Sequence, residues 1–309
     1  MAVLSSLILF SLFSTIMVIL ASININGLCN NDKITKSMHM FKACHYDIVC
    51  IQEIFWSSDN VEKYSALFEN DFYVFSNICS APIGRRGVCC LISKKSGIVI
   101  QRVATDDEGR VIQLVCEIDD NIVNITNIYS PRVPKERSLF FDNLGKYNVN
   151  DAINILVGDF NCKMNPAKDN SRTVLANSDQ SRKRLQQITN DYQYVDIWRN
   201  HHPNSLQFTW RRYDSINHIL FQSRIDYIFM NTDSLHHCIS SDIVRYPYSD
   251  HDVVKCNFNF ESVARGPGIW KFNNSLLDDE VYNFETRQII VNSKENRNFK
   301  VNKFDWRGT

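Results

Sequence analysis

The stretch INILVGDFN, residues 153–161, carries the pattern on which the predicted fold depends. Its first half, Ile153–Val157, is a short apolar run that ends at Gly158, as buried strands commonly do. Asp159 and Asn161 follow on the same side of an extended chain. We expect Asp159 to be exposed at the end of this buried strand, which is a suitable place for a catalytic base.

Other polar groups end, or lie within, apolar runs of the same kind. They are Asn24 and Asn26, Gln52-Glu53, Tyr129, Arg224-Ile225-Asp226 and the pentapeptide Tyr248-Ser249-Asp250-His251-Asp252. The runs that carry these groups are predicted to be strands at residues 16–24, 47–52, 122–128, 153–157, 224–230 and 253–260. If the runs end at one edge of the fold, the polar groups form one site.

Further strands are predicted at residues 72–75, 87–92, 98–103, 111–118, 208–211 and 239–246, and helices at 34–43, 134–147 and 180–192. In the helix at 134–147 we expect Leu139, Phe140 and Leu144 to face the core. About a dozen short strands with a few outer helices indicate an α/β or α+β sandwich of two packed sheets. Such a domain would occupy residues 16–261.

Composition limits the range of functions. The chain has 309 residues, 44% of them hydrophobic and 22% charged, which is ordinary for a globular protein. Lys plus Arg and Asp plus Glu are each 34, so the formal net charge is zero. A module that binds nucleic acid only by neutralising phosphates is usually basic. A nucleic-acid partner would therefore be held by a local basic patch, by a metal ion, or transiently.

The 10 cysteines form no CxxC pair and have no zinc-type spacing with histidine. Several of them, including Cys50, Cys89 and Cys90, lie inside apolar runs. We expect buried free thiols in a reducing compartment rather than disulfides.

Both ends of the chain differ from the middle. Residues 2–21 carry no charge and are long enough for a membrane span or a signal segment. No Lys or Arg precedes them, and residues 16–25 run into the first predicted strand, so we favour a soluble protein with an atypical leader at residues 1–15. Membrane association through residues 2–21 remains the alternative. Residues 262–309 are polar and Asn-rich and are expected to be a linker.

The polar groups suit the hydrolysis of a phosphodiester. Glu53, with Asn26 and Asp250, offers the oxygen ligands that Mg²⁺ prefers. Asp159 is a candidate base. Asn161 could hold the attacking water or a phosphate oxygen, and His251 is the natural partner for Asp226, because an unpaired carboxylate in an apolar strand is costly.

Each group also has a structural explanation. Asn24 and Asn26 suit a turn, and Gln52-Glu53 could be a solvated strand end. Asp226 could pair with Arg224 or Arg245, and His251 could be a hydrogen-bonded structural histidine.

Taken together and in order, the motifs resemble the endonuclease/exonuclease/phosphatase superfamily over residues 16–260. The segments that carry the resemblance are ININ at 23–26, IQE at 51–53, NIYSP at 127–131, GDFN at 158–161, SRIDYI at 223–228 and SDH at 249–251. Within the superfamily, SRIDYIF and the segment GPGIWKFNNSLL, residues 266–277, resemble the endonucleases of LINE-type retrotransposons, which are joined to a reverse transcriptase. The resemblance implies an α/β four-layer sandwich, in which two mixed, mostly antiparallel sheets are flanked by helices.

The resemblance also implies a role for each residue. Glu53 would be the main ligand of Mg²⁺, or of Mn²⁺ in its place, with Asn26 and Asp250 in the metal shell. Asn24 and Tyr129 would contact the scissile phosphate, Asp159 would activate water oriented by Asn161, Asp226 would orient His251, and Ser249 would lie near the DNA backbone. One residue departs from the pattern, because Arg132 stands where relatives commonly carry Asn.

Loop cations are the candidate DNA contacts, although any one of them could be an ordinary solvated charge. They are Arg85, Arg86, Arg132, Lys135, Arg137, Lys163, Lys168, Arg172, Arg211 and Arg212. The leading hypothesis is a nuclear or cytoplasmic Mg²⁺-dependent endonuclease that nicks double-stranded DNA and leaves a 3′-hydroxyl for reverse transcription, with no obligate oligomer. The alternatives are a phosphodiesterase that acts on a lipid or inositol phosphate at a membrane, and a non-catalytic relic.

Overall fold

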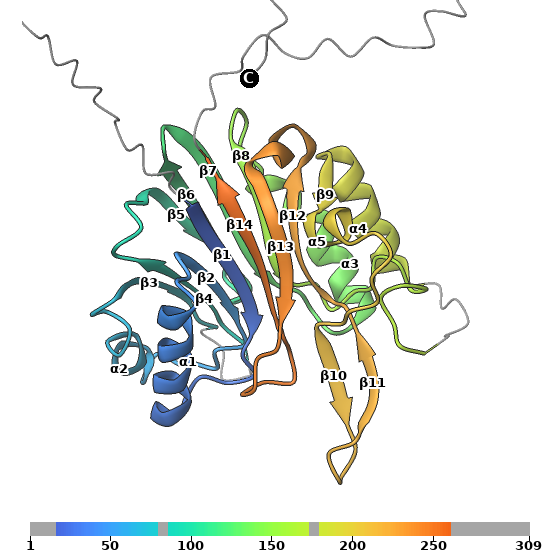
Figure 1. Ribbon diagram of the computed structural model, residues 1–309, viewed down its shortest axis with the longest axis horizontal. Helices are drawn as coiled ribbons and strands as arrows, with labels where there is room; N and C mark the ends of the chain where they lie inside the picture. Colours follow the sequence, from blue (N-terminus) through green and yellow to red (C-terminus); the bar gives the residue numbers. More distant parts are fainter. Residues whose placement is uncertain (1–16, 80–85, 173–178, 261–309) are drawn as a thin grey trace, which may run out of the picture. The chain divides into compact units, whose positions relative to one another are not determined.

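The computed structural model describes residues 17–79, 86–172 and 179–260, and their strands form two six-stranded sheets and a separate hairpin (Figure 1). In spatial order, the first sheet contains β13 (Cys238–Val244), β14 (Val253–Asn259), β1 (Met17–Asn24), β2 (Ile48–Gln52), β4 (Val88–Ser93) and β3 (Phe72–Asn77). The second contains β5 (Val99–Thr105), β6 (Val111–Ile118), β7 (Asn121–Tyr129), β8 (Ile153–Asp159), β12 (Asp226–Asn231) and β9 (Tyr194–Asp196).

Each sheet is mixed but mostly antiparallel. The parallel neighbours are β1 with β2 in the first sheet and β7 with β8 in the second. The other paired strands of both sheets run antiparallel. The predicted α/β sandwich is therefore confirmed. Because helices at Asn31–Ala43 and Pro134–Asp142 connect the strands of the two parallel pairs, the sequence alternates strand and helix at these points.

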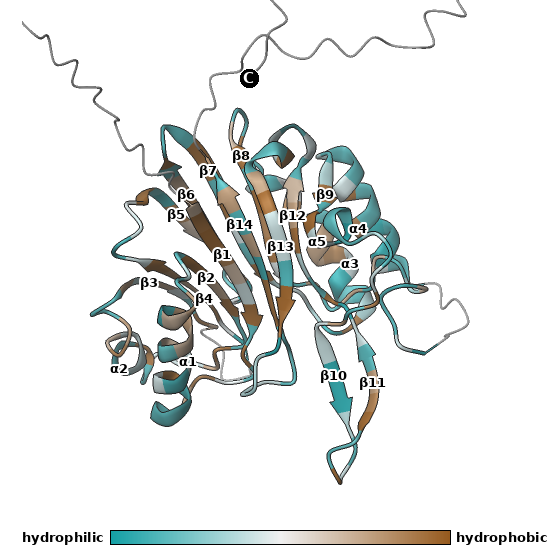
Figure 2. Ribbon diagram, in the orientation of Figure 1, coloured by the Kyte–Doolittle hydropathy of each residue, from teal (hydrophilic) through white to brown (hydrophobic). Residues whose placement is uncertain are grey.

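The core lies between the sheets and continues on both outer faces. In β1, Val18 and Leu20 face the second sheet, whereas Ala21 and Ile23 face outward, as expected from the alternation of side chains along a strand. Figure 2 shows the hydrophobic strands inside and hydrophilic helix surfaces outside. Two apolar faces on each sheet explain why the strands read as nearly continuous apolar runs rather than as alternating ones.

Helices cover both outer faces and complete four layers. The helices α1 (Asn31–Ala43) and α2 (Val61–Ser65) pack on the first sheet, and α3 (Pro134–Asp142) and α4 (Gln180–Asp191) on the second. A short helix, α5 (Ile197–His201), follows β9, and short 3₁₀ helices occupy Leu144–Tyr147 and Thr232–His237.

The helix predicted at 134–147 is two helices. The α-helix ends at Asp142, and a 3₁₀ turn at Leu144–Tyr147 redirects the chain. Leu144 is buried and Phe140 is partly buried, as expected, but Leu139 is 60% exposed, so the prediction for Leu139 was wrong. Because the helical period changes after Asp142, Leu144 can face the core although Leu139, in the preceding α-helix, does not.

The hairpin of β10 (Trp210–Tyr213) and β11 (Ile219–Ser223) projects from the edge of the sandwich (Figure 1). Met17–Ala21 belong to the uncharged stretch at residues 2–21, and they form part of β1 in the middle of the first sheet. The predicted leader at 1–15 and the predicted linker at 262–309 lie outside the described residues. Among the described helices, none is long and apolar enough to cross a membrane.

Candidate active site

The polar strand ends converge at one edge of the sandwich. The parallel pairs bring the carboxyl ends of β1, β2, β7 and β8 to this edge. Asp226, at the start of β12, pairs directly with Asp159 at the end of β8, and His251 lies just before β14. A pocket of about 420 Å³ opens there, lined by Asn24, Asn26, Glu53, Arg132, Asp159, Asn161, Lys163, Trp210, Phe221, Ser223, Ile225, Asp250 and His251.

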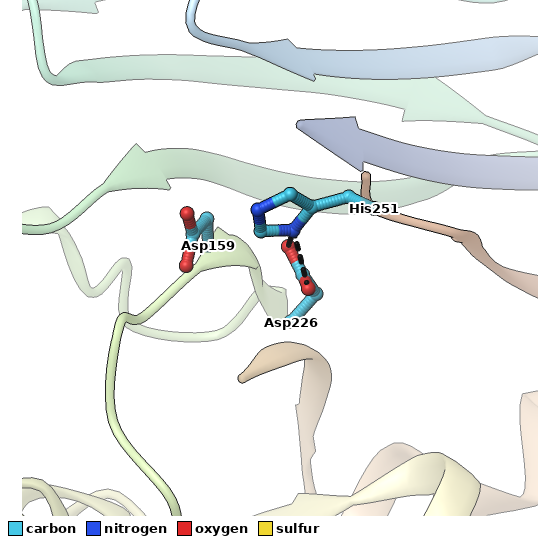
Figure 3. A group of neighbouring side chains, drawn as sticks. All are labelled: Asp159, Asp226 and His251. Carbon is cyan, nitrogen blue, oxygen red and sulfur yellow. Dashed lines mark hydrogen bonds and ion pairs between the residues drawn. The ribbon is translucent and has the colours of Figure 1, made fainter. Parts of the chain in front are cut away.

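Asp226 and His251 form the pair that the sequence predicted. The Nδ1 atom of His251 lies 3.1 Å and 2.9 Å from the two carboxylate oxygens of Asp226, and both side chains are buried. Figure 3 shows the ring between the two carboxylates, with its other nitrogen toward the side of Asp159. Burial alone would lower the pKa of His251, but the carboxylates of Asp226, Asp159 and Asp250 outweigh it and raise the pKa to about 10. The imidazole is therefore a cation at neutral pH.

The structural alternatives for Asp226 do not apply. Arg224 pairs instead with Asp169 at 2.9 Å and with Asp196 at 2.7 Å. Arg245 pairs with Asp252 at 2.9 Å.

Asp159 is completely buried, so the expectation of an exposed carboxylate was wrong. Its side chain accepts hydrogen bonds from Asn24 Nδ2 at 2.9 Å and from the backbone N–H of Asn161 at 2.8 Å. Asn24 belongs to the other sheet, and the sequence gives no indication that the two sheets close over this strand end. Burial, together with the nearby charge of Asp226, raises the pKa of Asp159 to about 7.

Glu53 is also buried, which rules out a solvated strand end. Its Oε1 atom accepts from Asn24 Nδ2 at 3.0 Å and from Arg132 Nη2 at 2.7 Å. Its Oε2 atom is buried and has no hydrogen-bond partner among the described residues. A buried carboxylate oxygen without a donor is costly, and a hard divalent cation would satisfy it. Glu53 therefore fits the predicted metal ligand.

Asn26 and Asp250 lie beside each other in the pocket. Asn26 Nδ2 donates to Asp250 Oδ1 at 3.1 Å, and Trp210 Nε1 donates to Asp250 Oδ2 at 2.9 Å. Burial would raise the pKa of Asp250, but His251 and these donors outweigh it, and the net pKa is lowered. Asp250 is therefore ionised, as a cation ligand needs to be.

A second group of ligand atoms could also hold a metal ion. One ligand atom each of Asp159, Asp226 and His251 lies within 4.8 Å of the others (Figure 3). The hydrogen bond between Asp226 and His251 already uses two of these groups, so Glu53 with its free oxygen is the better place for a cation.

Tyr129 ends β7 and is almost fully buried. Burial and the neighbouring carboxylates of Glu53 and Asp159 raise the pKa of its phenol, so the hydroxyl keeps its proton. The Ser249 hydroxyl donates a hydrogen bond within the protein, to the backbone carbonyl of Asn24 at 2.8 Å.

The predicted DNA contacts have different environments. Arg85 lies outside the described residues, and Arg211 is held by Asp252 at 2.6 Å. Arg137 is buried and bonds Asp179 at 2.9 Å, so it was wrong to expect a phosphate contact there. Lys163 and Arg132 line the pocket.

Two aromatic residues of the site were missed. Trp210 and Phe221, from the two strands of the hairpin, line the pocket with their rings 5.4 Å apart. The sequence offered little signal, because an aromatic residue in a strand is usually part of a core.

Residues 21–251 match the model of the endonuclease/exonuclease/phosphatase family, and the chain belongs to this family of nucleases and phosphatases. The chain is 28% identical over 269 residues to the "Transposon TX1 uncharacterized 149 kDa protein" of Xenopus laevis, covering 84% of this chain and 20% of that protein. It thus spans about a fifth of the length of this relative.

Solved structures share the fold. An AP endonuclease of Leishmania major has a TM-score of 0.67 at 16% identity, covering 79% of this chain and 88% of that one. The catalytic domain of Xenopus laevis APE2 has a TM-score of 0.66 at 20% identity, covering 78% and 92%. The Neisseria 3′ phosphatase NExo, solved with a product DNA hairpin, has a TM-score of 0.61 at 17% identity, covering 79% and 100%.

Proposed function

We propose that this chain is a Mg²⁺-dependent DNA endonuclease that nicks one strand and leaves a 3′-hydroxyl. The observation that carries the proposal is one pocket in which a cationic His251, held by Asp226, faces Asp159, while one buried oxygen of Glu53 has no hydrogen-bond partner in the described part of the chain. A base, a cation for the phosphate and a metal ligand are what phosphodiester hydrolysis needs.

Each side chain has a task in this reaction. Asp159 accepts a proton from the attacking water, and its pKa of about 7 suits a base near neutral pH. His251 donates its remaining N–H to a phosphate oxygen as negative charge develops there. The protonated phenol of Tyr129 donates toward the phosphate or the leaving oxygen. The new bond joins the water oxygen to phosphorus, and the P–O3′ bond breaks. The leaving 3′-oxygen takes up a proton from solvent or from Tyr129, which gives a 3′-hydroxyl and a 5′-phosphate.

Glu53, Asn26 and Asp250 would hold the divalent cation. When bound, Mg²⁺ supplies Lewis-acid stabilisation of phosphate charge, and Mn²⁺ has similar ligand preferences. Asn24 fixes the two carboxylates at a set separation, because its amide donates to both Glu53 and Asp159.

The comparisons support DNA as the substrate in this proposal, and we expect that DNA to be double-stranded. One structure of the same fold holds a DNA hairpin, and the sequence relative is a transposon protein of which this chain covers 20%. A reverse transcriptase that extends the 3′-hydroxyl is therefore the expected partner, within one longer polypeptide.

A plasmid assay tests the proposal. Purified protein should convert supercoiled DNA to the nicked circle with Mg²⁺ and fail to do so with EDTA, and a DNA polymerase should extend the nick without end repair. Glu53→Gln and His251→Ala should each abolish nicking, whereas Asp142→Asn on the distant helix α3 should not change it. Nicking by either site variant at the wild-type rate would refute the proposal, and cleavage of sphingomyelin or phosphoinositides without DNA cleavage would favour a lipid phosphodiesterase.

A further inference from the structure

Arg132 neutralises the residue to which the proposed metal would bind. Its Nη2 atom lies 2.7 Å from Glu53 Oε1, and the Glu53 side chain is only 2% exposed. A guanidinium on this carboxylate competes with a metal ion for its negative charge.

The contact is built so that it can be released. The Arg132 side chain is 69% exposed, so the guanidinium can leave Glu53 for solvent at little steric cost. The backbone, by contrast, is fixed: Arg137 is buried and donates from Nη1 to the carbonyl of Arg132 at 2.9 Å. Arg137 is itself held by Ser181 at 2.8 Å and by Asp179 at 2.9 Å. The backbone at Arg132 is therefore anchored, whereas its side chain is exposed.

The Arg132 side chain has a role both on Glu53 and when it has been released from Glu53. A divalent cation on Glu53 would repel a guanidinium that stays on the same carboxylate, since like charges a few ångströms apart oppose each other strongly at a partly buried site. Once released, Arg132 remains at the mouth of the pocket, where it can pair with a phosphate oxygen. By pairing with the Arg132 guanidinium, DNA would remove the group that competes with the metal for Glu53.

We propose that Arg132 is a displaceable counter-ion for Glu53 that couples metal binding to phosphodiester binding. The metal binds weakly to the free protein and tightly once a phosphate has taken the guanidinium, and by reciprocity DNA binds more tightly when the metal is present. The inference rests on the proposed metal-dependent function and names a positioning residue for it.

Mn²⁺ binding, followed by the electron paramagnetic resonance signal of the free ion, tests the inference without turnover. Arg132→Ala should raise the affinity of the DNA-free protein for Mn²⁺ by about tenfold or more, since it removes a like charge. Arg184→Ala is the matched control, because the Arg184 side chain is also exposed, by 46%, and also pairs with a carboxylate, that of Asp142, at 2.8 Å on the helices away from the pocket. It should leave the affinity unchanged.

The titration is then repeated with a phosphorothioate DNA duplex that resists cleavage. The duplex should tighten Mn²⁺ binding markedly in the wild type and much less in Arg132→Ala, and Glu53→Gln should remove tight binding altogether. Equal or weaker Mn²⁺ affinity of Arg132→Ala without DNA would overturn the inference, as would tight Mn²⁺ binding that survives Glu53→Gln. A protein that shows the coupling but never nicks plasmid would instead refute the proposed function.

Discussion

Among the carboxylates around His251, Asp226 contributes most to keeping the imidazole charged. Asp226→Asn removes the main interaction that opposes burial, so the pKa of His251 falls below its present value of about 10. The imidazolium then loses its proton at a lower pH, and the alkaline limb of the rate profile moves toward neutrality. Near pH 9 we expect the nicking rate to drop by about 100-fold, within the usual range for acid–base groups. Rates measured across pH for both proteins test this, and two parallel profiles would contradict it.

The raised pKa of Asp159 makes the free energy of unfolding depend on pH. Its folded pKa of about 7 lies above the ordinary value of 3.8, so the folded state favours the protonated form. The stabilisation of the folded state by the protonated Asp159 carboxyl is fully present below about pH 4 and is lost as the pH rises through about 7. Asp159→Asn cannot ionise, so its free energy of unfolding relative to wild type should rise by on the order of 1 kcal/mol or more between about pH 4 and pH 8. Urea unfolding in EDTA measures the difference. A constant difference at both pH values would show that the carboxyl is not strained by burial.

At the scale of elements, the parallel pair β7–β8 depends on Gly158. Its φ is +136°, and a Cβ atom there would overlap the carbonyl oxygen of Ile128 on β7. Gly158→Ala should therefore destabilise the protein by about 2–4 kcal/mol and displace Asp159. Gly97→Ala is the control, because Gly97 also has a positive φ, +71°, but has open space around its Cβ position. Thermal unfolding of both variants tests the argument, which fails if their costs are equal.

Elements were predictable where packing reinforces the local pattern. Strands with two buried faces, such as β2 and β8, stand out as short apolar runs. The sequence did not indicate β9, β11, α2 or α5, because β9 is only three residues long, β11 is largely exposed, and the helices have only five residues each. Segments this short have too few residues to show a period, and tertiary contacts rather than propensity hold them in place.

For the whole molecule, the core predicts how the thiols react. Cys50, Cys89, Cys90, Cys116, Cys162, Cys238 and Cys256 are buried, whereas Cys29 is exposed and Cys44 and Cys79 are half-buried. Burial also raises the pKa of Cys89 and Cys116, which makes the thiolate still rarer. An aromatic disulfide reagent should modify the three accessible thiols within minutes and the seven buried ones only at the rate of global unfolding. Fast modification of the seven buried thiols in native buffer would contradict their burial in the core.

The residues of the site were predictable from order along the chain, but their environment was not. Asp226 beside His251 follows from the cost of a lone carboxylate in an apolar strand. The burial of Asp159 and the contact of Arg132 with Glu53 depend on how the two sheets face each other, which involves residues that are far apart in sequence. Trp210 was missed for the same reason, since only the hairpin's position turns an ordinary strand aromatic into a donor for Asp250.

The last described strand lies in the interior of its sheet. β14 fits between β13 and β1, so the first and the last described strands are neighbours. On the ribosome, β1 can pair early with β2, but its other neighbour, β14, begins only at Val253. His251 lies just before β14 and lines the same pocket as Asn24, which ends β1, so a growing chain carries an incomplete pocket until this strand has been made. Under the proposed function, nicking activity would therefore begin only after the whole domain has been synthesised, which would protect the nucleic acids around the ribosome.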